Sequence, residues 1–363
     1  MRLVWGTVSA VVAAVDGLQD LEVVLDDGPR ERAINYPRLA HTCVEGDRVL
    51  LNTTAADLNL GTGGKHFVVA RLGEAAGVAL DTPAGGHIMK LRYTPLQVDV
   101  LSVESQESPH HAVMKRATDL AGMPVVCCGL HSQVPLVAAA VKQADPNLKV
   151  AYCMTDSAAL ALPLSDLVRA GVAEGLIDAT LSCGQAFGGQ FEAVNLHSGL
   201  LAARHVAGAD VAVAAIGPGV VGTATPFGRG GIAPGESINA AAVLGGVPIA
   251  ALRLSFTDTR ARHRVVSHHT LAALTQIALA PARIAVPVLP DDYAEQVEDA
   301  LESAGVWERH LRADSTAGRI PAPDMRGIVV KTMGRGIAED SAFFAAAFAA
   351  GQVAARVSHG ERG

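Results

Sequence analysis

The sequence has 363 residues, of which half are hydrophobic and 18% are charged, with 36 acidic and 29 basic side chains that leave a net charge of −7. This composition excludes extended disorder, because the chain can bury a large apolar core. The acidic balance argues against a nucleic-acid-binding protein, which usually presents a basic face. A chain of this length allows two domains, or one large domain and a small one.

The cysteines and the apolar runs indicate the cellular setting. The five cysteines are an odd count without a CxxC pair, which favours a reduced, cytoplasmic environment. No apolar run reaches, without a charge, the ~20 residues that cross a bilayer, so we expect a soluble protein with no membrane partner. The opening MRLVWGTVSAVVAAVDG has some features of a signal peptide, but Gly6, Thr7 and Ser9 interrupt its apolar run. We interpret this segment as the first strand of the fold.

Residues 1–72 are expected to form a small domain that resembles a β-barrel or a sandwich. Short strand-like runs alternate there with the turn sequences DG, DDGP, EGD and GTGG. The runs are LVWGTVSAVV, LEVVLD, RAINY, RVLLNT and HFVVARL. Residues 73–95 include GEAAGVALDTPAGG, whose Gly, Ala and Pro content is typical of a linker or crossing segment.

Residues 96–363 are expected to form an α/β domain with a doubly wound, mostly parallel sheet. Continuous rather than alternating apolar runs favour parallel strands that are covered on both faces. The runs are VDVLSVE, PVVCCG, LKVAYCMT, IDATLSC, DVAVAAIG, PIAALRLS, RIAVPVLP and IVVKTMG. The expected helices include HAVMKRATDLAG, QVPLVAAAVKQAD, LSDLVRAGVAEG, YAEQVEDALESAG and the closing FFAAAFAAGQVAARV.

Polar loops follow five of these runs, and parallel strands place such loops at one carboxyl edge of the sheet, where ligands bind. Three of the loops carry His131, Asp156 and Glu192, which are candidate catalytic residues. Each has a structural alternative: His131 and Ser132 are equally suited to cap the helix that follows, and Asp156 to form a turn. The cysteines near the strand ends are expected to pack in the core.

The segment GPGVVG matches the pattern G-x-G-x-x-G of dinucleotide-binding proteins, with glycines at Gly217, Gly219 and Gly222. It departs from that fingerprint because TATPFGRGG continues the loop where a helix should begin. The sequence therefore identifies no cofactor. Backbone N–H groups together with Thr223 and Arg229 are candidates for an anion cradle. A structural glycine-rich crossover is the alternative.

The segment DTRARHRVVSHHT (258–270) concentrates three arginines and three histidines in a largely apolar chain. If it continues the preceding strand, period 2 places the aspartate and the arginines on one face and His263 on the other. We expect Arg260 and Arg262 to be little exposed, or to contact Asp258, Glu192 or an anion, because unpaired arginines repel one another. These two arginines are candidate anion-binding residues.

Ser267 is expected to cap a helix whose first turn contains His268 and His269. The partial positive charge of a helix start disfavours imidazolium, so both rings should be neutral and able to bind a metal, a carbonyl or a phosphate. Adjacent helix positions diverge by ~100°, so one of the two is expected to face the site. The histidine spacing matches no standard zinc pattern such as HExxH, and the metal question stays open. A basic surface loop with a histidine-rich cap is the alternative.

Several of these strings together resemble a bacterial family defined only as domain of unknown function 3866. They are GLHSQ, CGQAFGGQFEAVN, GPGVVGTATPFGRGG, DTRARHRVVSHHT, KTMGRG and AEDSAFFAAAFAAG, and the resemblance extends over the full chain. The family brings no activity that can be transferred, so function is inferred from the residues alone.

The residues favour an enzyme that acts on a small anionic metabolite, for example a hydrolase. In this hypothesis Arg260 and Arg262 hold the anion beside the helix start. His131, His263 or His268 supplies acid–base chemistry, and Asp156 or Glu192 orients a histidine or binds a metal. Two alternatives stay open: a non-catalytic regulator that binds the metabolite, and a structural homo-oligomer with a vestigial cleft.

Overall fold

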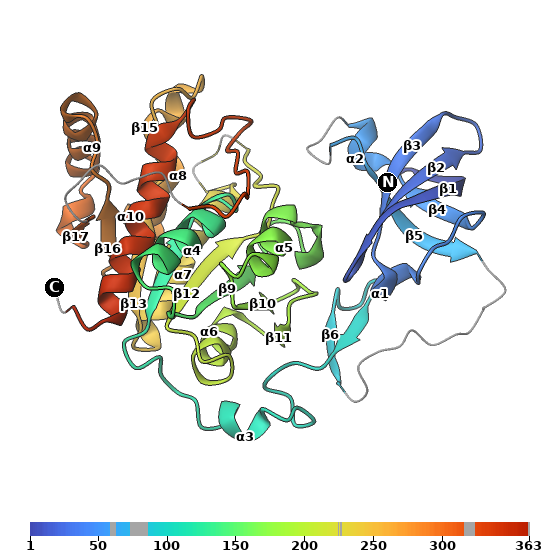
Figure 1. Cartoon of the computed structure of the whole chain (residues 1–363), viewed down its shortest axis with the longest axis horizontal. Coiled ribbons are helices and arrows are strands. Elements are labelled where there is room, and N and C mark those ends of the chain that lie inside the picture. The colour runs from blue at the N-terminus through green and yellow to red at the C-terminus, as the bar shows by residue number, and fades with distance from the viewer. Residues whose placement is uncertain (59–62, 73–85, 224, 226, 316–323, 362–363) are drawn as a thin grey trace. The chain divides into compact units, whose positions relative to one another are not determined.

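The computed structural model describes residues 1–58, 63–72, 86–223, 225, 227–315 and 324–361 (Figure 1). The chain divides into two compact units, Met1–Leu101 and Ser102–Gly363. Of the linker expected over residues 73–95, residues 73–85 lie outside the described part of the chain.

The first unit contains a closed five-stranded barrel in the order β1-β2-β3-β5-β4. All five strands that the sequence predicts are confirmed: β1 (Leu3–Val15), β2 (Leu18–Leu25), β3 (Arg30–Asn35), β4 (Arg48–Asn52) and β5 (His66–Leu72). Alternate side chains fill the interior, among them the fully buried Leu21, Val23, Val49 and Leu51. Two single-turn helices, α1 (Pro37–Ala40) and α2 (Thr54–Asp57), join the strands.

A short antiparallel ribbon completes the first unit. It pairs β6 (Ile88–Lys90) with β7 (Val98–Val100). The prediction that VDVLSVE is a strand of the large parallel sheet is therefore wrong. Val98 and Val100 are buried and Asp99 between them is not, and this alternation suits an antiparallel ribbon better than a sheet covered on both faces.

The second unit is built on an eight-stranded sheet in the order β11-β10-β9-β12-β8-β13-β16-β17, in which every neighbouring pair is parallel. Its strands are β8 (Pro124–Cys128), β9 (Val150–Thr155), β10 (Ala179–Cys183), β11 (Phe191–Ala193), β12 (Val211–Ile216), β13 (Val247–Ala251), β16 (Arg283–Val286) and β17 (Leu311–Asp314). The predicted strand in IVVKTMG is absent from the described residues, where Thr332 makes only an isolated bridge to Arg335.

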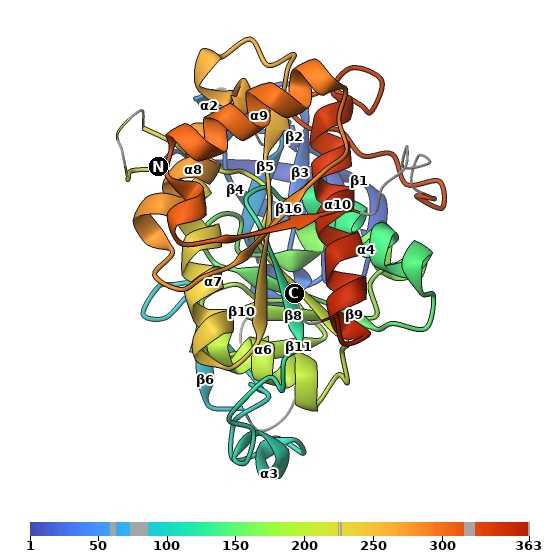
Figure 2. The same ribbon diagram turned by 90° about the vertical axis from the view of Figure 1, so that its left-hand side faces the viewer.

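Helices cover both faces of this sheet, as the sequence predicts. On one face α4 (Gln133–Ala144) and α10 (Ser341–Ser358) lie side by side in both views (Figures 1 and 2). The other face packs against α6 (Leu196–His205) and α7 (Ala233–Val243). Successive residues of β8 alternate between the two cores: Val126 and Cys128 pack on the α4 side, Val125 and Cys127 on the α6 side. All four are therefore apolar.

The remaining helices differ in how well the sequence predicts them. Both α5 (Asp166–Ala173) and α9 (Asp291–Ser303) form where expected. HAVMKRATDLAG yields only the single turn α3 (His111–Met114). Beyond it, the Asp119 carboxylate accepts a hydrogen bond from Ala121 N (2.8 Å), a local turn that competes with helix.

A glycine permits the close approach of α4 and α10. A Cβ on Gly351 of α10 would lie 2.4 Å from the Val137 carbonyl oxygen and 2.6 Å from Cβ of Ala140, both on α4. Only a residue without a side chain fits at this position, and the two helix backbones can therefore pack directly on each other.

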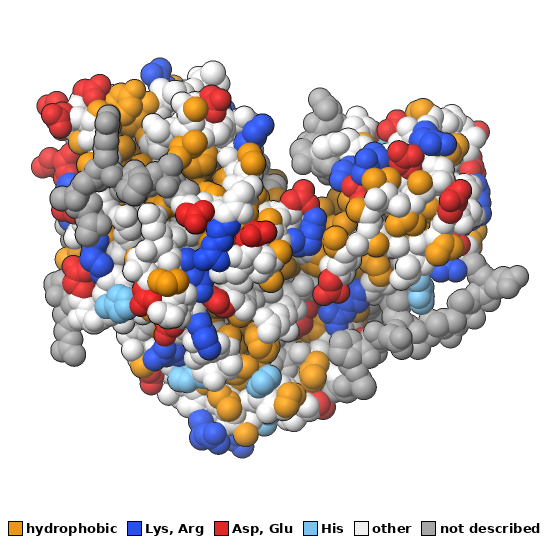
Figure 3. Space-filling view, in the orientation of Figure 1, with side chains coloured by type: hydrophobic (Ala, Val, Ile, Leu, Met, Phe, Trp, Pro, Cys, Tyr) orange, Lys and Arg blue, Asp and Glu red, His pale blue; other side chains and the backbone are white. Residues whose placement is uncertain are grey.

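The surface carries both signs of charge. On the face drawn in Figure 3, basic and acidic side chains are interspersed over the second unit. Within the described residues, no helix has the length and apolar character that crossing a membrane requires.

Candidate functional site

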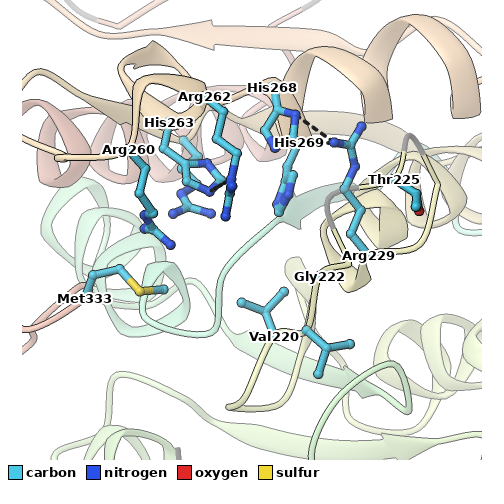
Figure 4. Close-up of a pocket in the computed structure, with 12 residues that line it drawn as sticks. Val220, Gly222, Thr225, Arg229, Arg260, Arg262, His263, His268, His269 and Met333 are labelled. Carbon is cyan, nitrogen blue, oxygen red and sulfur yellow. Dashed lines mark hydrogen bonds between the residues drawn. The ribbon is translucent and has the colours of Figure 1, made fainter.

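A cavity of about 230 Å³ lies at the carboxyl edge of the sheet, among the loops that follow β12 and β13 (Figure 4). We call it the arginine-histidine cavity. Its twelve lining residues are Val220, Val221, Gly222, Thr225, Arg229, Arg253, Arg260, Arg262, His263, His268, His269 and Met333. None of these described residues is acidic, so the wall of the cavity is positively charged.

The segment 258–270, which supplies two arginines and all three histidines of the wall, does not continue the strand, contrary to prediction. The short strand β14 (Leu254–Ser255) ends where the Asp258 N–H donates to Ser255 Oγ (3.0 Å). A 3₁₀ turn, η3 (Ala261–His263), follows, and β15 (Val265–Val266) returns antiparallel to β14. Because hydroxyl and carboxylate groups here bind the local backbone, the chain turns instead of extending. The arginines therefore share no strand face.

Three imidazole rings converge on the cavity. Ser267 caps α8 (His268–Ala272) as predicted, with Oγ accepting from His269 N (3.3 Å), and Ser267 Oγ lies 2.8 Å from Nδ1 of the buried His263. The ring centroids of His268 and His269 are 4.4 Å apart. The centroid of His263 is 4.9 Å from that of His269 and 5.3 Å from that of His268. The expectation that only one of the adjacent histidines faces the site is wrong, because Cα–Cβ bonds at a helix start tilt toward the N-terminus and both rings reach the cavity.

All three histidines are neutral at pH 7. Burial lowers the pKa of His263 to about 3, with the positive charge of Arg253 adding to the effect. Burial and then the neighbouring His268 lower the pKa of His269 to about 3. The pKa of His268 is also lowered, first by burial and then by the charge of Arg229. The neutral state that the sequence predicts for His268 and His269 is confirmed, but its main cause is burial.

One carboxylate organises the arginines behind the cavity wall. Asp258 is buried and accepts two hydrogen bonds from the Arg260 guanidinium, at 2.9 and 2.8 Å. It also pairs with Arg335 (3.2 Å) and lies 4.0 Å from Arg253. The hydrogen bonds from Arg260 hold the pKa of Asp258 well below its usual range. The predicted contact of Arg260 with Asp258 is confirmed.

Arg262 behaves differently from Arg260. It is exposed, and its Nε lies 3.4 Å from Nε2 of His263. Among the described residues it pairs with no carboxylate. Low exposure and a contact with Asp258 or Glu192 are therefore not found for Arg262, because a single buried carboxylate is already shared by three other arginines. The expected contact of Arg262 with an anion stays a prediction. Its guanidinium stays available at the cavity (Figure 4).

Most of the glycine-rich loop shapes the chain and does not line the cavity. Gly217 and Gly219 are not among the lining residues, and a Cβ on Gly217 would lie 2.6 Å from the Ala159 carbonyl oxygen. Thr223 Oγ1 donates to the Gly228 carbonyl (2.8 Å), so this hydroxyl is engaged within the loop. The predicted departure from the dinucleotide-binding fingerprint is confirmed, since the α-helix after this strand, α7, begins only at Ala233, after the 3₁₀ turn η2 (Gly230–Ile232).

Arg229 closes one side of the cavity. Its NH1 donates to Nδ1 of His268 (2.8 Å), as the dashed line in Figure 4 marks. Its Nε is buried without a hydrogen-bond partner. Burial lowers the pKa of the guanidinium.

His131, Asp156 and Glu192 are not among the residues that line this cavity. Nε2 of His131 lies 2.5 Å from Ser165 Oγ, and burial lowers the pKa of His131 to about 4. Asp156 accepts from Gln185 N (2.9 Å). The buried Glu192 accepts from Ser182 Oγ (2.6 Å) and Gly188 N (2.7 Å). These bonds hold the edge loops in place, and the catalytic roles of the three residues stay predictions.

Sequence reasoning missed three contributors to the site. Arg253 and Met333 line the cavity, and Arg335 pairs with Asp258. Arg253 stands at the end of an apolar run, PIAALRLS, and was assigned to the strand. Met333 and Arg335 lie in KTMGRG, and the only feature that could have drawn attention to this segment is that it contributes to the resemblance to a known family.

A family model described as protein of unknown function (DUF3866) matches residues 32–351. The chain belongs to the DUF3866 family. The matched part includes every residue that lines the arginine-histidine cavity, so this DUF3866 member has its whole candidate site within the family region. No curated protein and no solved structure matches the chain.

Proposed function

We propose that the protein is an enzyme, of the hydrolase type, that acts on a small anionic metabolite held in the arginine-histidine cavity. The observation that carries this proposal is the make-up of the wall, which presents four arginines and three histidines and, among the described residues, no carboxylate. Phosphate and carboxylate groups match the fork of donors that arginine presents. A volume of about 230 Å³ suits a small ligand.

The free donors support anion binding. Arg262 is exposed at the cavity without a described acidic partner, and the guanidinium of Arg229 also lines the cavity without a described acidic partner. One exposed arginine contact contributes under ~1 kcal/mol. Several donors in a partly dry cavity together support micromolar affinity, about −8 kcal/mol. Arg260 is less free, because Asp258 already engages it.

The imidazoles are the candidate acid–base groups. Histidines with a pKa near 3, such as His263 and His269, are weak bases on their own. A bound anion stabilises imidazolium and so raises the pKa toward the range in which histidine transfers protons. Ligand binding and catalytic competence would then be coupled in the same cavity.

The test is ligand-induced thermal stabilisation across a panel of phosphorylated and carboxylated metabolites. We expect hits to raise the melting temperature of the wild-type protein and to lose that effect in the double variant Arg229→Gln/Arg262→Gln, because the free donors are gone. Arg264→Gln is the matched control, since Arg264 is exposed in the same segment but does not line the cavity. Turnover of the hits in phosphoester and carboxylester assays then tests the hydrolase.

Two results would count against the proposal. Full stabilisation in the double variant would place the anion elsewhere. If hits bind at the cavity but are not turned over, the protein binds a metabolite without catalysis, and the enzyme proposal is rejected.

We further propose a cytoplasmic location. All five cysteines are free and buried, as suits a reduced compartment.

A further inference from the structure

We propose that His263, His268 and His269 form a binding site for a divalent transition metal such as Zn²⁺ in the wall of the arginine-histidine cavity. One ring nitrogen from each histidine lies within 4.8 Å of those of the other two. Three nitrogens bound to one tetrahedral zinc ion, each at ~2.0 Å, stand ~3.3 Å apart. In our proposal the side chains rotate on metal binding to reach that spacing.

His263 already has the support that a metal ligand needs. Its Nδ1 is 2.8 Å from Ser267 Oγ, and with Nδ1–H donating to this hydroxyl, the lone pair is on Nε2. A metal ion that binds there replaces the weak hydrogen bond from Arg262 Nε (3.4 Å). Histidines that bind metals almost always donate their other ring N–H to such a partner, which fixes the ring. Because Ser267 also caps α8, the same hydroxyl couples His263 to the helix that carries the other two histidines.

His269 has an unsatisfied ring nitrogen. Its Nδ1 is buried without a hydrogen-bond partner, an arrangement that costs free energy unless a ligand satisfies the atom. The ring packs closely against Gly231, where a Cβ would lie 2.4 Å from Nδ1, so only glycine fits beside it. A turn of the ring toward the cavity that His269 lines would let a metal ion satisfy this nitrogen.

At His268 a cation already occupies a ring nitrogen. The Arg229 guanidinium donates to Nδ1 at 2.8 Å and its NH1 is 3.4 Å from Nε2 (Figure 4). A metal that binds His268 through Nδ1 replaces this hydrogen bond and releases Arg229 into the cavity. Metal and arginine therefore compete for the same ring, and the released guanidinium becomes a further anion donor.

The donor set defines the kind of site. Three neutral imidazoles with no carboxylate leave the ion its full double charge and an open coordination position, which is the arrangement of catalytic rather than structural zinc. The nearby arginines oppose the ion, and an anion in the cavity offsets that repulsion. We therefore expect phosphate to strengthen Zn²⁺ binding. This coupling rests on the proposed function, whereas the histidine site itself does not.

The experiment measures metal binding to the full-length, chelator-treated protein. Zn²⁺ is titrated against a chromophoric chelator, and Co²⁺ is followed by its visible absorption bands, which distinguish tetrahedral from octahedral coordination. We expect one ion per chain. His268→Gln and His269→Gln should each weaken binding at least about tenfold, the loss that even outer-shell partners cause. His197→Gln, at an exposed position of α6, is the matched control and should bind as the wild type does.

A second measurement on the wild-type protein tests the metal site even if the histidine variants do not fold. In the wild-type protein, the ring ¹⁵N signals of the three histidines must shift when Zn²⁺ is added, and absence of such shifts overturns the site. Wild-type affinity in both cavity variants overturns it as well.

Arg229→Gln separates the two proposals made for this cavity. It should strengthen Zn²⁺ binding, because it removes a competing donor and a positive charge, and it should weaken anion binding. Anion binding without Zn²⁺ binding would leave the proposed function standing and reject the metal site. Zn²⁺ binding without any anion effect would do the reverse.

Discussion

At the scale of single residues, His131 illustrates how burial and hydrogen bonding favour the neutral form of an ionisable side chain. Its ring is held between Ser165 Oγ (2.5 Å) and the Ile216 carbonyl oxygen (3.2 Å), and the Tyr152 hydroxyl lies 3.3 Å from Nδ1. These contacts suit a neutral imidazole. Burial lowers its pKa to about 4, although the bond to Ile216 works in the opposite direction.

This depressed pKa predicts acid sensitivity. In the unfolded chain His131 becomes protonated below pH ~6.5, whereas in the folded protein it stays neutral down to about pH 4. The free energy of unfolding therefore falls as the pH drops through this window, by about 1.4 kcal/mol per pH unit for this one group. Urea unfolding between pH 7.5 and 4.5 should show a shallower decline in His131→Gln than in the wild type. Parallel declines would mean that His131 is not the group responsible.

Arg260 and Arg262 should differ in their contribution to stability, although both line the cavity. Arg260→Ala removes two hydrogen bonds to the buried Asp258 and should lower the free energy of unfolding by about 2 kcal/mol. Arg262→Ala removes an exposed side chain and should change it by less than ~0.5 kcal/mol. Denaturant unfolding of both variants without ligand measures the contrast. Equal losses would show that Asp258 does not depend on Arg260.

At the scale of elements, the close contact between α4 and α10 leads to a stability prediction opposite to the one that helix propensity alone would give. Alanine is favoured over glycine inside a helix by about 1 kcal/mol. Gly351→Ala should nevertheless destabilise the protein, because its Cβ would lie 2.4 Å from the Val137 carbonyl oxygen and the two helices must move apart. The melting temperature decides the sign. An increase would mean that the helices separate without cost.

The elements that the sequence predicts well are those with a strong local pattern. The barrel strands alternate, the central strands of the sheet are continuously apolar, and α10 is rich in alanine, so one local signal suffices for each. The edge strands β11 and β17 lack such a signal. Residues 311–314, LRAD, mix apolar and charged residues and are mostly exposed, and they form a strand because they pair with the edge of β16. The apolar stretch in IVVKTMG forms none in the described residues.

The same distinction holds for the candidate site. Ser267 as a cap and the neutral His268 and His269 follow from local chemistry and were predictable. The pairing of Arg335 with Asp258 joins positions 77 residues apart, and no local pattern specifies it. The inward tilt of both adjacent rings depends on side-chain direction at the helix start and not on the ~100° step between positions.

At the scale of the whole molecule, the sheet order explains where the cavity forms. From β8 the chain moves through β9, β10 and β11 toward one edge, returns to insert β12 beside β8, and then continues through β13 and β16 to β17 at the other edge. The loops after β12 and β13 leave on the two sides of β8, where the direction of winding reverses. Open parallel sheets bind ligands at such a switch point. The arginine-histidine cavity occupies it, whereas Glu192, predicted in a loop, lies within the edge strand β11.

The position of α10 has a consequence for biosynthesis. On the ribosome, the nascent chain completes all eight strands of the sheet before residues 341–358 emerge. Until then α4 and α5 cover only part of the face that α10 will share, and apolar side chains that pack against Phe343 and Phe348 are open to solvent. The second unit therefore cannot close its core during most of its translation. A nascent chain in this state exposes a large apolar surface, and we expect chaperones that recognise exposed apolar segments to bind it at that stage.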